Sequence, residues 1–395
     1  MRPVHYIPVM NLRRFFIPFF LVFCISVSGQ KLTEIDISGL LKTERNPVLS
    51  EIASGIDLVK LETTPGCLIQ SVTSIMRWGT NFLIVANGRK SLLIFTQQGK
   101  FVKSFGTIGK GPGEFLEIYG MAFDAKTDHL FILDNGQVKL IEYDGTGKFI
   151  KEIKLGFYAT GVKVVDNGFY FYTGSVYSYK TGSCLLTVTD RAGNVLNRFH
   201  KRPFEKGLPD QNATKYSDQR NWCYWEPYWD TVYTFDGSSY HPKYFFNIGK
   251  DRIPRELQES RDMFEKDIDG YRWIVSYMEC QNFLYFQIID KGRTGKKLVY
   301  DKISKAGYCI PHNPVYNHWG FMNDFCGGPL FPLTIKMSMT EVACAYQMVD
   351  LKEYFANGWI DIKKAKNPAL SREFIEIIKG STADDNPILV IATLK

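Results

Sequence analysis

A strand-rich unit that recurs about every 48 residues is the feature that most constrains the fold. Three pairs of similar residues share a spacing of 48 positions: Asn87 with Asn135, Phe95 with Tyr143, and Gly99 with Gly147. Looser copies place Gly193 a further 46 residues along and Gly237 another 44. Each copy reads as a strand ending in a polar residue, followed by a two-stranded hairpin around a glycine turn. Strand repeats of this length are typical of β-propeller blades, which bury their faces against neighbouring blades.

The sequence therefore predicts an all-β fold, a six-bladed β-propeller with a few short helices in the inter-blade insertions. We expect one domain over residues 30–395, whose 366 residues hold six units with about 80 residues left over, or seven units with fewer. Residues 202–229 read as a long insertion that is too polar early and too aromatic late for a strand. Because ring closure removes exposed edges, the terminal strand at 388–395 is expected to complete a blade alongside N-terminal sequence.

Helices are predicted at 254–268, where Pro254 occupies the first helical position, and at 348–356 and 371–379.

Residues 1–29 are expected to be a signal peptide that is removed before Gln30. Arg13 and Arg14 form a positive region, residues 15–27 are mostly apolar, and Gly29 supplies a small residue at the cut. The apolar run is too short for a comfortable membrane span. A lipoprotein acylated at Cys24 is the minority alternative. No later segment reaches eighteen apolar residues, so we expect export to the periplasm or cell surface and no integral membrane segment in the mature chain.

The charges and cysteines exclude several protein classes. Removing the three leader arginines from the formal charge of +7 leaves +4, and the remaining basic residues are scattered rather than clustered as in nucleic-acid binders. The eight cysteines form no C-x-x-C pair and no zinc spacing. We interpret them as small buried apolar residues rather than as a disulfide framework.

Four motifs carry a resemblance to a known family. They are GKGPGEF at 109–115, WDTVYTF at 229–235, NDFCGGPLFP at 323–332 and DNPILVI at 385–391. The first resembles the inter-blade loop of NHL-type propellers, and the four in this order resemble the secreted six-bladed, TolB-like β-propellers of Bacteroidetes. The resemblance covers residues 31–395. It implies six blades and export, with a frequent lipoprotein anchor that the bulky Phe23 disfavours here, and it supplies no catalytic residues.

Motif chemistry points to binding rather than to catalysis. The glycines at 106–113 lack the spacing of a phosphate-binding loop, so a turn between blades is the preferred interpretation. Two aromatic and polar clusters remain as candidate ligand-binding residues, since aromatic faces stack on sugar rings and polar side chains bind hydroxyls. They are Trp222, Trp225, Tyr228 and Trp229 in one segment, and His318, Trp319, Asn323 and Asp324 in the other. Packing between blades is the competing and more common role for such rings.

Two classes of function remain open. The favoured hypothesis is a non-catalytic ligand-binding or protein-interaction propeller of the bacterial cell envelope, monomeric and without a cofactor, whose partner is an envelope protein or a glycan. The alternative is a carbohydrate-active or lactone hydrolase or lyase with its site at the mouth of the central tunnel. An Asp, Asn or His metal site at that mouth would favour the enzyme.

Overall fold

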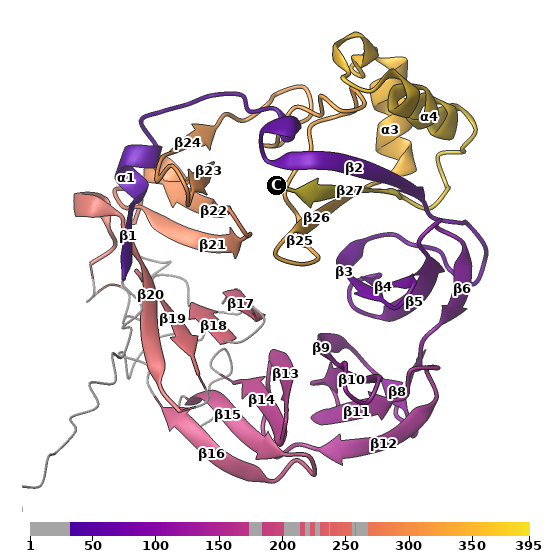
Figure 1. Cartoon of the computed structure of the whole chain (residues 1–395), viewed down its shortest axis with the longest axis vertical. Coiled ribbons are helices and arrows are strands. Elements are labelled where there is room, and N and C mark those ends of the chain that lie inside the picture. Colours follow the sequence, from indigo (N-terminus) through magenta and orange to yellow (C-terminus); the bar gives the residue numbers. More distant parts are fainter. Residues whose placement is uncertain are drawn as a thin grey trace, which may run out of the picture. The chain divides into compact units, whose positions relative to one another are not determined.

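Six sheets, five with four strands and one with five, stand around a common centre and form a β-propeller (Figure 1). The computed structural model describes residues 32–173, 184–200, 214–217, 222–225, 230–236, 238–254, 257 and 268–395. Each sheet is one blade, and its strands run in chain order from the centre outwards, except in the last blade. The prediction of six blades is confirmed, and the alternative of seven is wrong.

Among the described residues, no helix interrupts the first three blades. Blade 1 comprises β3 (Val72–Trp78), β4 (Asn81–Ala86), β5 (Ser91–Thr96) and β6 (Phe101–Ser104). Blade 2 comprises β9 (Ile118–Asp124), β10 (His129–Asp134), β11 (Lys139–Tyr143) and β12 (Phe149–Lys154). Blade 3 comprises β13 (Gly161–Val165), β14 (Gly168–Tyr172), β15 (Cys184–Asp190) and β16 (Val195–His200). The short parallel strands β7 (Thr107–Ile108) and β8 (Glu114–Phe115) lie in the connection between blades 1 and 2.

The remaining blades carry the helices and the N-terminal strands. Blade 4 comprises β17 (Thr214–Ser217), β18 (Trp222–Trp225), β19 (Thr231–Phe235) and β20 (Tyr240–Asn247). Blade 5 comprises β21 (Trp273–Glu279), β22 (Phe283–Asp290), β23 (Thr294–Asp301) and β24 (Gly307–Ile310). Blade 6 comprises β25 (Ile335–Lys336), β26 (Glu341–Tyr346), β27 (Ile388–Leu394) and β2 (Ala53–Lys60). Helices α3 (Met348–Ala356) and α4 (Pro368–Lys379) lie between β26 and β27.

Ring closure takes place in blade 6, as the sequence predicted. The C-terminal strand β27 pairs on one side with β26 and on the other with β2, from Ala53 opposite Leu394 to Lys60 opposite Ile388. Sequence from both ends of the described chain therefore meets in one sheet, and β2 covers the edge that β27 would otherwise expose.

The N-terminal segment also fastens the outside of blades 4 and 5. Strand β1 (Thr33–Asp36) adds to the outer edge of β20 in parallel, and helix α1 (Ile37–Leu40) follows it. Isolated bridges then join Glu44 to Cys309 and Val48 to Met322, before the 3-10 turn η1 (Leu49–Glu51) leads into β2. Residues 33–60 thus contact three consecutive blades.

The glycines of the repeat occupy equivalent hairpin turns. Gly99, Gly147 and Gly193 have φ angles of 80°, 86° and 89°, in the left-handed region that side chains other than glycine rarely adopt. At Gly99 a Cβ atom would also collide with the carbonyl oxygen of Lys60. The recurring glycine spacing therefore marks a backbone requirement of the third turn of each blade.

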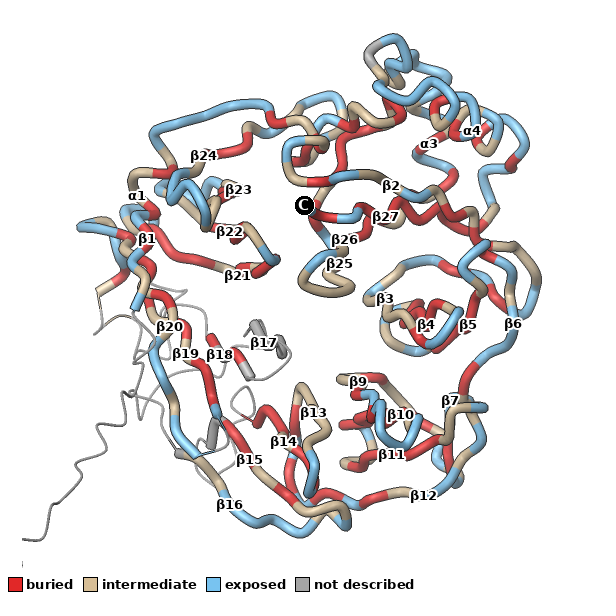
Figure 2. Tube along the Cα trace, viewed as in Figure 1, coloured by how far each residue is buried: buried red, intermediate tan, exposed pale blue. Residues whose placement is uncertain are grey.

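The hydrophobic core lies between neighbouring blades. One cluster combines blade 1 and blade 2 residues such as Leu83 and Ile132, and another joins blades 2 and 3 through the edge-to-face pair Phe131 and Phe169, 5.0 Å apart. Figure 2 shows buried residues concentrated in middle strands such as β11, while outer strands such as β12 and β16 are more exposed. The aromatic surplus of the sequence serves this packing.

Several sequence predictions are decided by the described residues. The expectation that 202–229 contains no strand is wrong, since β17 and β18 lie within it and pair with each other. The predicted helices at 348–356 and 371–379 correspond to α3 and α4. Most of the helix predicted at 254–268 and all of the leader at 1–29 fall outside the described residues.

The six cysteines whose side chains are described are buried and form no disulfide with one another, which supports their interpretation as apolar core residues. Among the described residues, no helix is long and apolar enough to span a membrane.

Candidate functional site

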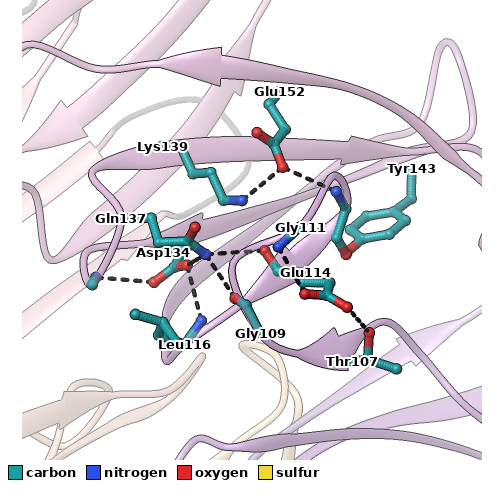
Figure 3. Close-up of polar contacts among 12 residues, drawn as sticks. Thr107, Gly109, Gly111, Glu114, Leu116, Asp134, Gln137, Lys139, Tyr143 and Glu152 are labelled. Atoms are coloured by element: carbon teal, nitrogen blue, oxygen red, sulfur yellow. Dashed lines mark hydrogen bonds and ion pairs between the residues drawn. The ribbon is translucent and has the colours of Figure 1, made fainter.

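The glycine-rich connection between blades 1 and 2 is a structural clamp. The backbone N–H groups of Gly111 and Gly113 donate to carboxylate oxygens of Glu114 (2.7 Å) and Glu152 (2.9 Å), and Tyr143 donates its hydroxyl to the carbonyl of Gly113 (2.6 Å) (Figure 3). Carboxylates therefore already occupy the N–H groups that a phosphate would need.

Blade 2 holds this connection through buried polar side chains. Asp134 is fully buried and accepts from the backbone N–H of Leu116 (2.9 Å) and from the amide of Gln137 (2.9 Å) (Figure 3). The buried ammonium of Lys139 lies 2.6 Å from the Glu152 carboxylate. Burial raises the pKa of Glu152, but the hydrogen bonds from Lys139 and Gly113 outweigh this effect, so the pKa lies below its ordinary value. These contacts support the interpretation of the segment as a turn between blades.

The alternation of strands places the inter-blade connections that the structure describes on one face of the propeller, which we call the loop face. The loop face also carries the connections between the second and third strands of a blade. These include the β4–β5 turn and the insertion between β26 and β27 that contains α3 and α4. The described hairpin turns of the opposite face are short, such as those at Gly79 and Gly99. Because long connections are free to vary while strands are committed to packing, the loop face is where a binding site is expected.

A cleft of about 380 Å³ opens on the loop face between blades 6 and 1. Its walls are the start of β3, the start of β25, the end of β26, helix α3 and the connection from blade 5 to blade 6. The lining side chains include Ser71, Thr73, His318, Thr334, Asp350 and Tyr354. Asp350 and Tyr354 lie one helical turn apart, so α3 presents both to the same side.

Neighbouring hydrogen bonds fix the walls of the cleft. Gln347 donates its side-chain amide to the carbonyl of Gln70 (3.1 Å), which joins blade 6 to blade 1. The buried hydroxyl of Tyr346 donates to the carbonyl of Leu330 (2.8 Å). Backbone segments that are fixed by these hydrogen bonds therefore bound the cleft on both sides.

An aromatic group lies at the α3 side of the cleft. The Tyr316 ring packs edge-on against Tyr354, with ring centroids 5.2 Å apart, and its hydroxyl donates to the carbonyl of Trp359 (2.6 Å). The His318 ring lies 5.9 Å from Tyr316, and its Nδ1 donates to the carbonyl of Trp319 (3.1 Å). Burial lowers the pKa of His318 and raises that of Tyr354, so burial favours the uncharged form of both rings.

The first predicted cluster does not reach this cleft. Trp225 has no exposed surface and packs edge-to-face against Tyr277 of blade 5, 5.5 Å away. A fully buried ring cannot stack on a ligand, so the role that the structure gives Trp225 is packing. The side chain of Trp222 and all of Tyr228 and Trp229 lie outside the described residues, so their proposed role stays a prediction.

The second predicted cluster divides into two parts. His318 lines the cleft, whereas the half-buried Trp319 faces blade 5, where its ring lies 4.7 Å from that of His312. Asn323 is 4% exposed and its carbonyl oxygen accepts from the backbone N–H of Cys326 (3.3 Å). It therefore shapes its own turn.

Asp324 belongs to a fastening of the N-terminal segment. Its carboxylate accepts from the backbone N–H (2.9 Å) and hydroxyl (2.5 Å) of Ser50, and it pairs with Lys366 (2.9 Å). Lys366 also donates to the Ser50 hydroxyl (2.5 Å). Ser50, Asp324 and Lys366 thus form a network that holds the segment before β2 against the connection from blade 5 to blade 6.

Sequence reasoning missed the residues of the cleft other than His318. Tyr354 and Asp350 lie in a segment predicted only as a helix, and Ser71 and Thr73 stand at the start of an ordinary strand. The one sequence signal for Asp350 and Tyr354 was the polar face of the helix predicted at 348–356. Among the described residues, no group of three or more His, Cys, Asp or Glu side chains is arranged to hold a metal ion.

Comparison with solved structures supports the fold. The chain resembles a protein of Bacteroides fragilis NCTC 9343 described as exported, with a TM-score of 0.72, 20% identity, and coverage of 92% of this chain and 100% of that one. A DUF4221 family member from Bacteroides vulgatus gives a TM-score of 0.49 at 10% identity, covering 89% and 98% of the two chains, which is too distant to support an argument. No curated protein sequence matches the chain.

A family model, by contrast, matches residues 32–393, from just before β1 into the C-terminal strand β27. The chain therefore belongs to the family described as a domain of unknown function, DUF4934, and folds as a six-bladed β-propeller.

Proposed function

We propose that this protein is a non-catalytic binding propeller of the bacterial cell envelope, whose loop-face cleft binds a neutral, hydroxyl-rich ligand of the glycan class. The observation that carries the proposal is the chemistry of the cleft. The described residues that line it offer hydroxyl, amide, imidazole and carboxylate groups, but include no lysine or arginine. Such a lining favours hydroxyl groups over anionic ligands such as phosphates.

The size and shape of the cleft support the same class. Its volume of about 380 Å³ lies at the lower end of the range for small-molecule sites. Tyr354 provides a ring on which the apolar face of a sugar can pack, while Asp350 and Ser71 can bind hydroxyls at its edge. The glycan class therefore fits better than a purely apolar ligand.

Export is part of the proposal. Residues 10–29 have the arrangement of a signal peptide, and the Bacteroides fragilis protein of the same fold is described as exported. We therefore place the protein in the periplasm or at the cell surface, with a glycan or an envelope protein as its partner.

A glycan array with the full chain, followed by calorimetry on the best ligand, tests the proposal. Tyr354→Ala and Asp350→Asn should each weaken binding, by about 5-fold or more for the tyrosine, because a stacked ring contributes on the order of 1 kcal/mol or more. Glu353→Gln is the matched control, since this exposed residue lies on α3 but does not line the cleft.

Equal affinity of the wild-type protein and the Tyr354→Ala variant would refute the site. Conversion of the bound glycan into products by the wild-type protein would instead support the alternative, a carbohydrate-active hydrolase or lyase.

A further inference from the structure

A second cavity, of about 330 Å³, lies where the N-terminal segment crosses blade 5, on the face opposite the loop face. Blade 5 contributes the hairpin turn between β23 and β24 and the strand ends beside it. We call it the hairpin-face cavity, and its polar lining includes Thr43, Arg45, Glu51, Asp301 and Ser304. Among the described residues, none lines both this cavity and the loop-face cleft, so the cavity is a separate candidate site.

Backbone pairing with blade 5 fixes the N-terminal wall of the cavity. Arg45 donates its backbone N–H to the carbonyl of Cys309 in β24 (3.1 Å), and Cys309 donates its own N–H to the carbonyl of Thr43 (2.8 Å). Because side chains alternate along an extended segment, Thr43 and Arg45 point to the same side of it. Both side chains line the cavity.

The guanidinium of Arg45 is the cationic group of the cavity. Its central carbon lies 3.8 Å from the centroid of the Tyr308 ring, and its Nη2 lies 2.7 Å from the Glu51 carboxylate. Stacking on an aromatic ring orients a planar guanidinium. The contact with Glu51 uses one terminal nitrogen, so the other N–H groups of the guanidinium can bind a carboxylate of a ligand.

Asp301 supplies a carboxylate to the wall that blade 5 forms. Its Oδ1 accepts from the backbone N–H groups of Ile303 (2.9 Å) and Ser304 (2.6 Å), which fixes the carboxylate in the hairpin turn. An ionised carboxylate has acceptor sites on both oxygens, so Oδ2 can accept from an ammonium group of a ligand. The buried side chains of Phe283 and Val299 add an apolar surface to the same cavity.

We propose that the hairpin-face cavity binds a free α-amino acid with an apolar side chain. Arg45 binds the α-carboxylate, Asp301 binds the α-ammonium, and the ligand side chain packs on Phe283 and Val299. A volume of about 330 Å³ lies at the lower end of the range for small-molecule sites. The lining contains one arginine but two acidic side chains, which disfavours a purely anionic ligand.

Calorimetric titration of the full chain with three forms of leucine tests the proposal. At pH 7 leucine carries both charges, leucinamide carries only the ammonium, and N-acetylleucine carries only the carboxylate. Each derivative loses one charge-assisted contact, so we expect leucine to bind at least about 10-fold more tightly than either of them.

Two substitutions assign the charged groups. Arg45→Met should lower the affinity for leucine by about 10-fold and leave that for leucinamide unchanged. Asp301→Asn, which keeps the oxygen that accepts from the turn, should lower the affinity for leucine and leave that for N-acetylleucine unchanged. Lys42→Met is the matched control, because this exposed basic residue lies in the same segment but does not line the cavity.

Absence of leucine binding to the wild-type protein would overturn the proposal, as would equal affinity for the three compounds. Both results come from the wild-type chain, so they do not depend on whether a variant folds. Leucine affinity that is unchanged in Arg45→Met and Asp301→Asn would also overturn it, because leucine would then bind elsewhere. Thermal melting of each variant shows that a loss of binding does not reflect unfolding.

Discussion

Replacing Asp324 by alanine should destabilise the protein, in contrast to the binding role that the sequence indicated for it. The substitution removes the acceptor for two hydrogen bonds from Ser50 and the partner of Lys366. A hydrogen bond to a charged group contributes about 1.5–3 kcal/mol, and the exposed Lys366 pair adds at most about 1 kcal/mol. Since the two Ser50 bonds share one carboxylate, we expect a total loss of roughly 2–4 kcal/mol.

Guanidinium denaturation of the wild-type protein, Asp324→Ala and Lys366→Met measures this loss. Lys366→Met is the matched control, because it removes the exposed lysine with its contacts to Asp324 and Ser50 but keeps the carboxylate and its bonds from Ser50, and it should cost about 1 kcal/mol or less. A loss below about 0.5 kcal/mol for Asp324→Ala would refute the fastening role of this residue.

The same comparison has a defined pH dependence. Burial raises the pKa of Asp324, but the hydrogen bonds from Ser50 and Lys366 more than offset this and leave the pKa below its ordinary value. The contribution is therefore fully present above the unfolded carboxylate pKa of about 4 and is lost as the pH falls through the lower folded pKa. The stability difference between wild type and Asp324→Ala should persist at neutral pH and narrow below about pH 4.

Three further substitutions or deletions test the packing of the ring. Trp225→Ala should cost about 3–5 kcal/mol because it empties a buried inter-blade site, and an unchanged melting temperature would contradict this. Tyr143→Phe removes one buried hydrogen bond to Gly113 and should cost about 1–2 kcal/mol in denaturation, whereas no loss would mean that the bond is unimportant. Deletion of 388–395 removes β27 and leaves β2 without its partner, so calorimetry should show no cooperative transition; a native-like transition would argue against closure in blade 6.

The sequence predicted the fold well because the propeller repeats a local pattern. The glycine at each third turn is required by backbone conformation alone, so Gly99 and Gly147 mark the blades without tertiary information. Strands β17 and β18 were missed because the inner strand of blade 4 is short and polar and the next is rich in tryptophan. Such strands are stabilised by pairing and inter-blade packing rather than by alternation.

The candidate site was much less predictable. Gln70 and Gln347 are 277 positions apart and meet only because the ring closes between blades 6 and 1. Residues that line a cleft formed by ring closure come from segments far apart in the chain. The sequence around each of them therefore gives no local sign of the site. His318 was found because it stands in a conspicuous aromatic segment, but the same reasoning also selected Trp225, which the structure buries.

A crystal structure of the full chain with the best glycan from the array tests the proposed binding role most directly. The proposal predicts electron density for a sugar ring against Tyr354, with hydroxyl groups within hydrogen-bonding distance of Asp350 and His318. Density for the glycan at any other surface, with the cleft between blades 6 and 1 filled only by water, would contradict it.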